Sequence, residues 1–331
     1  MEQSGFWNFF FATGLPQAYL AARLKEGEEV VFPPMPPPGA PGGGTLPPSV
    51  PGMMDKKDMC PPSADRPEIH RGADEMHMRT KALVLRAVDY KESDKILTLL
   101  TQESGKLTAS ARGCRKKGSP VAAGVQLLAW SDLVLYEYRG RWTVKEAAVE
   151  REFLGLRRDV ERLALACYFA EAAEALAVED VPAPELLSLV LNSLYALDQM
   201  PQKPLALVKA AFELRLMCAA GYEPILDGCA VCGAERPEEP RFHLREGALH
   251  CAKCRGGVGE GISMPVSPPV LAAMRHVVCG DARRLFSFRL DSGALEELAG
   301  VSEAYLLTQL ERGFRTLDFY KQMTLPAGPD R

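Results

Sequence analysis

Residues 106–112 have the sequence KLTASAR, in which apolar and polar side chains alternate strictly. Successive side chains of a β-strand point to opposite faces, so Leu107, Ala109 and Ala111 share one face. The opposite face carries two cations and two hydroxyl groups, from Lys106, Thr108, Ser110 and Arg112. The stretch therefore predicts a half-exposed strand whose outer surface is cationic and rich in hydroxyls.

Four further short runs around this strand have the composition of strands. They cover residues 83–88, 96–101, 132–138 and 141–147. Arg139-Gly140 joins the last two into a hairpin, and a long connection separates the third strand from the fourth. Five short strands in this order are typical of a small barrel, for which the OB-fold is the leading candidate. The strand pattern by itself also fits a small SH3-like barrel.

After Arg157 the apolar residues recur at helical spacing. We expect helices over residues 160–168, 184–197, 204–221, 268–278 and 294–320, the last as one continuous helix. Val160, Leu163 and Ala164 are expected on the buried stripe of the first helix. The predicted fold class is α+β multidomain, with an N-terminal five-stranded OB-fold β-barrel over residues 78–153 followed by an α-helical domain over residues 154–325.

Two cysteine pairs interrupt the helical part. Cys229 and Cys232 are followed, eighteen residues later, by Cys251 and Cys254, which is the spacing of a four-cysteine zinc site. We therefore expect a structural Zn²⁺ held by these four thiolates, in a four-cysteine zinc module over residues 226–258 inserted between helices. Two disulfides or a redox Cys-x-x-Cys pair are weaker alternatives. His243 and His250 are expected at the surface or behind the ligands, although either imidazole is able to replace a thiolate.

The distribution of charge matters more than its total. The 331 residues have a net charge of -4, but residues 78–151 hold 14 basic and 8 acidic side chains. The segments on either side are acidic. A basic surface able to bind an anionic partner such as nucleic acid is therefore expected only on the predicted barrel. The overall composition, 47% hydrophobic and 25% charged, is that of a soluble protein, and no membrane segment is predicted.

The long connection of the barrel carries a basic cluster. It contains Arg112, Arg115, Lys116 and Lys117 between flexible glycines, and such cations attract a phosphate backbone independently of sequence. Aromatic residues in the nearby strands offer faces on which bases can stack. They are Trp130, Tyr136, Tyr138 and Trp142. The alternative is that the tryptophans fill the barrel core and the basic run is a solvated loop.

Gly113 and Gly118 have the spacing of a phosphate-binding P-loop. The lysine that should follow is replaced by Ser119-Pro120, so we expect no ATP site. The remaining cysteines, Cys60, Cys114, Cys167, Cys218 and Cys279, lack pairing spacings, which is consistent with a reducing cytoplasm.

The order of these motifs closely resembles the RecO family of bacterial DNA-repair mediators. The resemblance rests on residues 81–86 and 92–95, on Gly105-Lys106-Leu107 and Ala111-Arg112-Gly113, and on Gly221-Tyr222-Glu223-Pro224 ahead of the first cysteine pair. It extends from about Met78 to Tyr320. It implies an OB-fold joined to a helical domain with a zinc module, in a cytoplasmic, nucleoid-associated bacterial protein.

The resemblance also implies a function. Members of the family bind single- and double-stranded DNA and anneal complementary strands. With RecR they help the recombinase RecA, an indirect partner, to displace single-stranded-DNA-binding protein in the RecF pathway. The helical domain is expected to bind the C-terminal tail of single-stranded-DNA-binding protein. The DNA-contacting residues correspond here to Lys106, Arg112, Arg115, Lys116, Lys117, Arg139 and Arg141, with Lys91 and Lys95 as further candidates.

Residues 1–77 depart from the family. They contain a Pro/Gly-rich linker at residues 33–52, and residues 6–24 resemble a short YqzL-like peptide. We expect a disordered extension, either fused in frame or translated from a start codon assigned too early.

Two rival functions remain at this stage. In the first, a non-enzymatic adaptor docks repair partners through its helical domain and DNA binding is secondary. The second, a zinc hydrolase, needs an open coordination position, which four cysteines do not leave.

Overall fold

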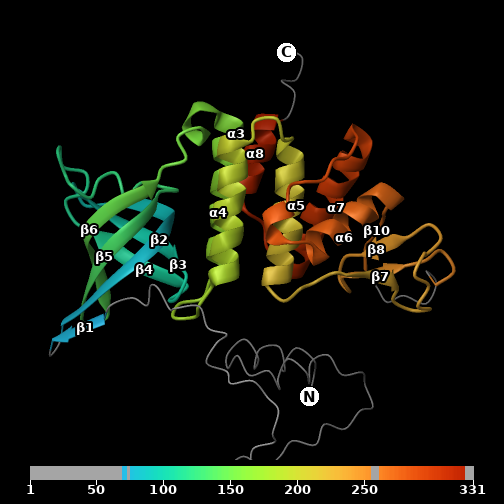
Figure 1. The fold of residues 1–331 in the computed structure, drawn as a ribbon, viewed down its shortest axis with the longest axis horizontal. Coiled ribbons are helices and arrows are strands. Elements are labelled where there is room, and N and C mark those ends of the chain that lie inside the picture. The colour runs from blue at the N-terminus through green and yellow to red at the C-terminus, as the bar shows by residue number, and fades with distance from the viewer. Residues whose placement is uncertain (1–68, 73–74, 255–260, 325–331) are drawn as a thin grey trace, which may run out of the picture. The chain divides into compact units, whose positions relative to one another are not determined.

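The computed structural model describes residues 69–72, 75–254 and 261–324, which fold as an α+β protein (Figure 1). A sheet comes first in the chain, and helices follow it. The strands of this sheet are β1 (Ile69–Gly72), β2 (Glu75–Tyr90), β3 (Asp94–Thr101), β4 (Lys106–Ala111), β5 (Trp130–Tyr138) and β6 (Arg141–Arg151). The proposed linker and the YqzL-like segment lie outside the described residues.

The five long strands pair in a series that returns to its start. β2 pairs with β3, β3 with β4, β4 with β6, β6 with β5, and β5 again with β2. The β4–β6 pair is parallel and the others are antiparallel. All five predicted strands are present, but β2 begins at Glu75, ahead of the expected start of folded sequence at Met78, and β1 pairs with this early part.

Alternation of side chains explains the core of this sheet. Leu107, Ala109 and Ala111 of β4 are buried, and the first two lie opposite Leu99 and Leu97 of β3 in the paired register. The connection between β4 and β5 adds buried apolar side chains to the same cluster, namely Cys114, Val121 and Val125. Each fully buried aliphatic side chain contributes about 1.5–3 kcal/mol, so the connection is tied to the sheet.

The helical part consists of α3 (Val160–Leu176), α4 (Pro184–Gln199), α5 (Leu205–Ala219), α6 (Pro268–Cys279), α7 (Ser292–Leu310) and α8 (Arg315–Thr324), with 3₁₀ turns η2 (Leu156–Arg158) and η4 (Ala282–Arg284). Its core is aromatic: the rings of Phe169 and Phe212 stack with centroids 3.9 Å apart. Asp159 caps the first turn of α3 by accepting hydrogen bonds from the N–H groups of Glu161 and Arg162.

Two helix predictions were wrong. The single helix expected over residues 294–320 is two helices, because Glu311 adopts a left-handed conformation with φ 49° and the chain turns before α8. Val160, expected on the buried stripe of α3, is 56% exposed, since it lies at the first residue of the helix, outside the packed middle.

Backbone contacts join the sheet to the helices. The N–H of Lys106 donates to Val178 O at 3.0 Å, and the N–H of Ala183 donates to Gln102 O at 3.0 Å. Gly105 between them has φ 57°, and a Cβ there would lie 2.1 Å from Val181 O, so only glycine fits. Backbone hydrogen bonds therefore hold the β3–β4 turn against the connection between α3 and α4.

A second, smaller sheet lies between α5 and α6 in the chain. Its strand order is β10 (Ser263–Pro265), β8 (Arg241–His243), β9 (Ala248–His250) and β7 (Ile225–Cys229). The four strands are short, and both cysteine pairs lie at their ends or in the adjacent turns.

Candidate nucleic-acid interface and metal centre

The outer face of β4 carries the side chains that the alternation predicted. Thr108 is exposed, and Ser110 lies within 3.1 Å of the Thr143 hydroxyl on β6. Lys106 is half-buried at one end of the strand and Arg112 is exposed just beyond the other end. A cationic and hydroxyl-rich strip therefore runs along the outside of the sheet.

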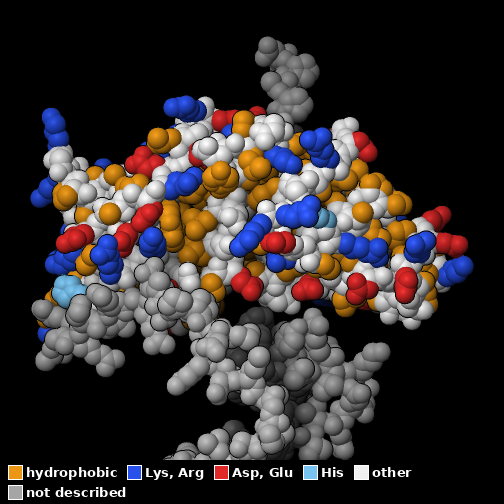
Figure 2. Space-filling view, viewed as in Figure 1, with side chains coloured by type: hydrophobic (Ala, Val, Ile, Leu, Met, Phe, Trp, Pro, Cys, Tyr) orange, Lys and Arg blue, Asp and Glu red, His pale blue; other side chains and the backbone are white. Residues whose placement is uncertain are grey.

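The basic cluster follows this strip. Arg115, Lys116 and Lys117 are exposed, whereas Cys114 between them and β4 is 4% exposed in the core of the sheet. This connection is the teal-green loop at the upper left of Figure 1, and Figure 2 shows Lys and Arg side chains at its projecting tip. The loop therefore has a buried base and a charged tip.

The cations of the loop differ in their partners. Arg115 lies 3.3 Å from the Asp89 carboxylate, in a pair whose side chains are 40% and 58% exposed. Arg112, Lys116 and Lys117 form no ion pair with any other residue of the part that the structure describes. Unpaired exposed cations keep their charge available for an anionic partner.

Two hairpin turns add further cations. Lys91 lies over the ring of Tyr90 at 5.2 Å, and Arg139 lies over the ring of Tyr138 at 5.1 Å. Both tyrosines are about half exposed, at 49% and 47%. Arg141, opposite Tyr138 in the β5–β6 register, is exposed as well, whereas Lys95 is half-buried opposite Ala111.

The aromatic candidates are distributed differently from the expectation. Trp142 packs against the core of the sheet, as the core-filling alternative required, whereas Trp130 packs against the helical core instead. The Tyr136 ring contacts Lys145 and His77. Tyr138 remains a half-exposed face, and Tyr90 is a second one that sequence reasoning missed, although its position before a turn cation matches that of Tyr138.

The four predicted cysteines come together. The Sγ atoms of Cys229, Cys232, Cys251 and Cys254 all lie within 4.8 Å of one another. A tetrahedral zinc ion with Zn–S bonds of about 2.3 Å requires sulfurs about 3.8 Å apart, and the distance from Cys232 Sγ to Cys251 Sγ is 3.8 Å. The four thiols therefore fit one metal ion, and no disulfide links them in the described structure.

Tight turns place these thiols. The N–H of Gly233 donates to Cys229 O at 2.9 Å and that of Cys254 to Cys251 O at 3.1 Å. Burial alone would raise the pKa of Cys229, but hydrogen bonds from backbone N–H groups, including that of Cys251, lower it to about 6, whereas hydrogen bonds among the thiols, with Cys251 first, raise the pKa of Cys254. A thiolate at neutral pH is the form that binds metal.

The two histidines of the module do not lie at the surface. His243 and His250 are buried, with their rings 5.8 Å apart. His250 Nε2 lies 2.9 Å from a Glu246 carboxylate oxygen, and His243 Nδ1 accepts the Glu246 N–H at 3.1 Å. Neither belongs to the group of four thiols, so the surface expectation was wrong and replacement of a sulfur is not observed.

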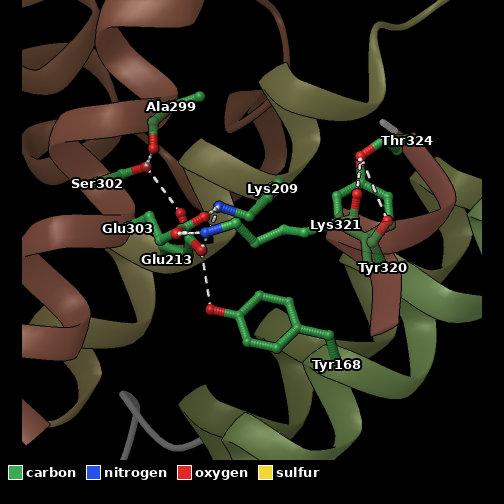
Figure 3. Close-up of polar contacts among 9 residues, drawn as sticks. All are labelled: Tyr168, Lys209, Glu213, Ala299, Ser302, Glu303, Tyr320, Lys321 and Thr324. Atoms are coloured by element: carbon green, nitrogen blue, oxygen red, sulfur yellow. Dashed lines mark hydrogen bonds and ion pairs between the residues drawn. The ribbon is translucent and has the colours of Figure 1, made fainter. Parts of the chain in front are cut away.

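Sequence reasoning missed a buried ionic cluster in the helical part (Figure 3). Lys209 Nζ lies 2.8 Å from Glu213 Oε1 and 2.8 Å from Glu303 Oε2. Glu213 also accepts hydrogen bonds from Tyr168 and Ser302, and Lys321 donates to Glu303 at 2.6 Å. The pair Lys209 and Glu213, four residues apart in a helix whose only other charged residue is Arg215, was a signal that could have revealed it.

The protonation of this cluster follows from its geometry. Burial would lower the pKa of Lys209, but the Glu213 and Glu303 carboxylates raise it above its ordinary value. Burial raises the pKa of Glu213, which Lys209 offsets in part. The charges compensate one another within the core, so the cluster is a structural feature.

Comparison with known proteins decides the family. A family model described as Recombination protein O N terminal matches residues 76–153, and one described as Recombination protein O C terminal matches residues 157–318. The chain belongs to the RecO family.

Individual relatives agree. The DNA repair protein RecO of Acetivibrio thermocellus is 32% identical over 75% of this chain and 97% of its own length. The DNA repair protein RecO of Alkaliphilus metalliredigens is 30% identical over 75% of this chain and 100% of its own length. The DNA repair protein RecO of Anaeromyxobacter dehalogenans strain 2CP-1 is 38% identical over 70% of this chain and 90% of its own length.

The two RecO matches divide the chain at the end of the sheet. The N-terminal match contains all the cationic candidates, and the C-terminal match contains the four cysteines and, of the buried ionic cluster, Lys209, Glu213 and Glu303. Residues before 76 lie outside both RecO matches. None of the described helices combines the length and the apolar character needed to cross a membrane.

Proposed function

We propose that this chain is a non-catalytic DNA-binding mediator of DNA repair and recombination. The observation that carries the proposal is the set of exposed, unpaired cations on the loop after β4, in a chain of the RecO family. Annealing two strands requires that their phosphates be neutralised and held close, which cations achieve without a nucleophile or general base. The names of the relatives support a role in repair.

The DNA surface follows the outer strip of β4 and the two turns. It comprises Lys106, Arg112, Arg115, Lys116, Lys117, Arg139 and Arg141, with Lys91 and Lys95 at its edge. We interpret the returning series of strand pairs as an OB-fold barrel, because a five-stranded barrel with a parallel closing pair has this order. Tyr90 and Tyr138 offer faces for unpaired bases.

The zinc module has a structural role in this proposal. Four thiolates fill the tetrahedron of a Zn²⁺ ion and leave no position for substrate, which is the arrangement of structural sites. The ion would hold together the turns at the ends of the short strands β7 to β10, whose side chains Phe242 and Leu249 are buried in the helical core.

The partners follow from the family resemblance. They are single- and double-stranded DNA, RecR, the C-terminal tail of single-stranded-DNA-binding protein and, indirectly, RecA, in a cytoplasmic and nucleoid-associated setting. A groove of about 550 Å³ lined by α4, α5 and α6 favours the rival adaptor function as a second role, because a peptide segment fits such a space. Partner binding that survives loss of DNA binding would separate the two roles.

The decisive experiment reverses the charge of the loop. Arg115→Glu, Lys116→Glu and Lys117→Glu together should weaken binding to every DNA sequence, and should flatten the dependence of log K on log salt by about 0.9 for each lost phosphate contact on duplex DNA. A salt series of DNA binding by fluorescence anisotropy measures both.

The matched control reverses three exposed arginines of the helical part, as Arg283→Glu, Arg284→Glu and Arg289→Glu. The control changes the net charge by the same amount as the loop variant, so an effect of net charge alone would weaken DNA binding equally in both. An unchanged salt slope in the loop variant contradicts the proposed DNA surface.

A further inference from the structure

Two carboxylates of the β2–β3 hairpin lie beside the basic loop, and they contact it in different ways. Asp89 pairs with the guanidinium of Arg115 at 3.3 Å. Asp94 forms no ion pair with a cation of the described residues; its Oδ1 accepts the backbone N–H of Gly113 at 2.8 Å. One carboxylate therefore neutralises a cation of the loop, while the other holds the loop's backbone.

The contact of Asp94 lies at the point where the chain leaves β4. Gly113 has φ 65°, so the backbone turns sharply there, and its N–H is directed at Asp94. The Ser93 hydroxyl also lies 3.2 Å from the same carboxylate oxygen. The Gly113 N–H holds the pKa of Asp94 below its usual value, which keeps this acceptor ionised at neutral pH.

Two neighbouring contacts complete the base of the loop. The N–H of Arg115 donates to Ser93 O at 3.0 Å, and the Cys114 side chain is buried in the core of the sheet. The N–H of Lys116 donates to Gly113 O at 3.1 Å, so the turn that presents Lys116 and Lys117 is built directly on the residue that Asp94 holds. The direction of the cationic tip thus depends on the hairpin between β2 and β3.

We propose that Asp94 is a positioning residue for DNA binding: it fixes the basic loop, residues 112–118, in the orientation that meets the phosphates. Asp89 has the opposite effect, because it competes with phosphate for Arg115. The inference rests on the proposed DNA-binding function. It gives a negatively charged residue, Asp94, a role in that function beside the cations that contact the DNA.

The sign of the effect distinguishes positioning from simple electrostatics. A carboxylate near a phosphate-binding surface repels DNA, so electrostatics alone predicts tighter binding when either aspartate is removed. Positioning predicts weaker binding for Asp94→Ala, since a loop that must be ordered on binding loses affinity. The two aspartates share one hairpin, which makes them matched controls for each other.

The experiment uses the full chain and four variants, Asp94→Ala, Asp94→Asn, Asp89→Ala and Asp89→Asn, with single-stranded DNA of mixed sequence. We expect Asp94→Ala to bind roughly tenfold more weakly. Asp94→Asn retains an oxygen that accepts the Gly113 N–H, so it should bind as tightly as the unchanged chain or more tightly. Both Asp89 variants should bind more tightly, by about twofold to fivefold.

A second measurement needs no DNA. Trypsin cleaves after Arg115, Lys116 and Lys117 only when the loop opens locally. Asp94→Ala should be cut faster there, and Asp94→Asn and the Asp89 variants at the unchanged rate. Equal melting temperatures of the four variants would show that the rest of the fold is intact.

The outcomes separate the two proposals. If the unchanged chain binds no DNA, the proposed function fails, and the trypsin rates still decide whether Asp94 orders the loop. If the chain binds DNA but Asp94→Ala binds as tightly as Asp89→Ala, the positioning role is overturned and the proposed function stands. Faster cleavage with weaker binding, restored by Asp94→Asn, supports positioning.

Discussion

The sheet and the helical part use lysine in opposite ways. The side chain of Lys209 in α5 is 6% exposed and lies between two carboxylates, whereas Lys116 and Lys117 after β4 are exposed and unpaired in the described structure. A buried ammonium must be compensated within the protein, because leaving water costs several kcal/mol. An exposed ammonium needs no such partner and is available to a ligand. The same residue type thus supports stability in one region and the proposed function in the other.

The largest expected effect is at Lys209. Lys209→Met leaves the Glu213 carboxylate buried without a cation, whereas Glu303 keeps Lys321, so the free energy of unfolding should fall by about 3–5 kcal/mol. The control is Lys81→Met, which removes an ion pair with Glu150 whose side chains are 51% and 41% exposed. It should change the free energy of unfolding by less than about 1 kcal/mol. Equal losses in urea titrations of the two variants would break the comparison.

The zinc module tests whether stability and DNA binding are separate. Cys229→Ser removes one of the four thiols, so bound zinc should be lost and the chain should be destabilised by about 2–3 kcal/mol. DNA binding should be unchanged at temperatures where the variant is folded, because the cationic candidates lie on the other sheet. Metal analysis, thermal melts and anisotropy on one sample measure all three. Lost DNA binding with an intact melting temperature would reverse the assigned roles.

The smallest expected effect is at Tyr138. Tyr138→Ala removes a half-exposed ring beside Arg139, and binding of single-stranded DNA should weaken by about 1 kcal/mol, or roughly fivefold. Tyr195→Ala is a close control, since that ring of α4 is also 47% exposed and lies 5.3 Å from Arg151. If both substitutions weaken binding equally, the sheet has no special role in stacking.

Local pattern predicted much of this structure. The alternation in residues 106–112 predicted β4 and its cationic outer face, and two Cys-x-x-Cys pairs predicted the cluster of four thiols. The turn at Glu311 was missed, since apolar spacing continued across it and the left-handed residue is not a glycine. The surface alternative for His243 and His250 was wrong because burial of a polar ring depends on strands that are distant in sequence.

The sequence by itself predicted the five long strands and most of the helices, and that four thiols and a basic run are present, because backbone geometry imposes periods of two and 3.6 residues on any packed chain. Only the tertiary structure decided what each charge does. Lys209 is buried because Glu303, 94 residues later in the chain, meets it, and the basic loop is oriented because Asp94, on a neighbouring strand, accepts the N–H of Gly113. Burial and orientation depend on contacts between distant segments, and no local period encodes them.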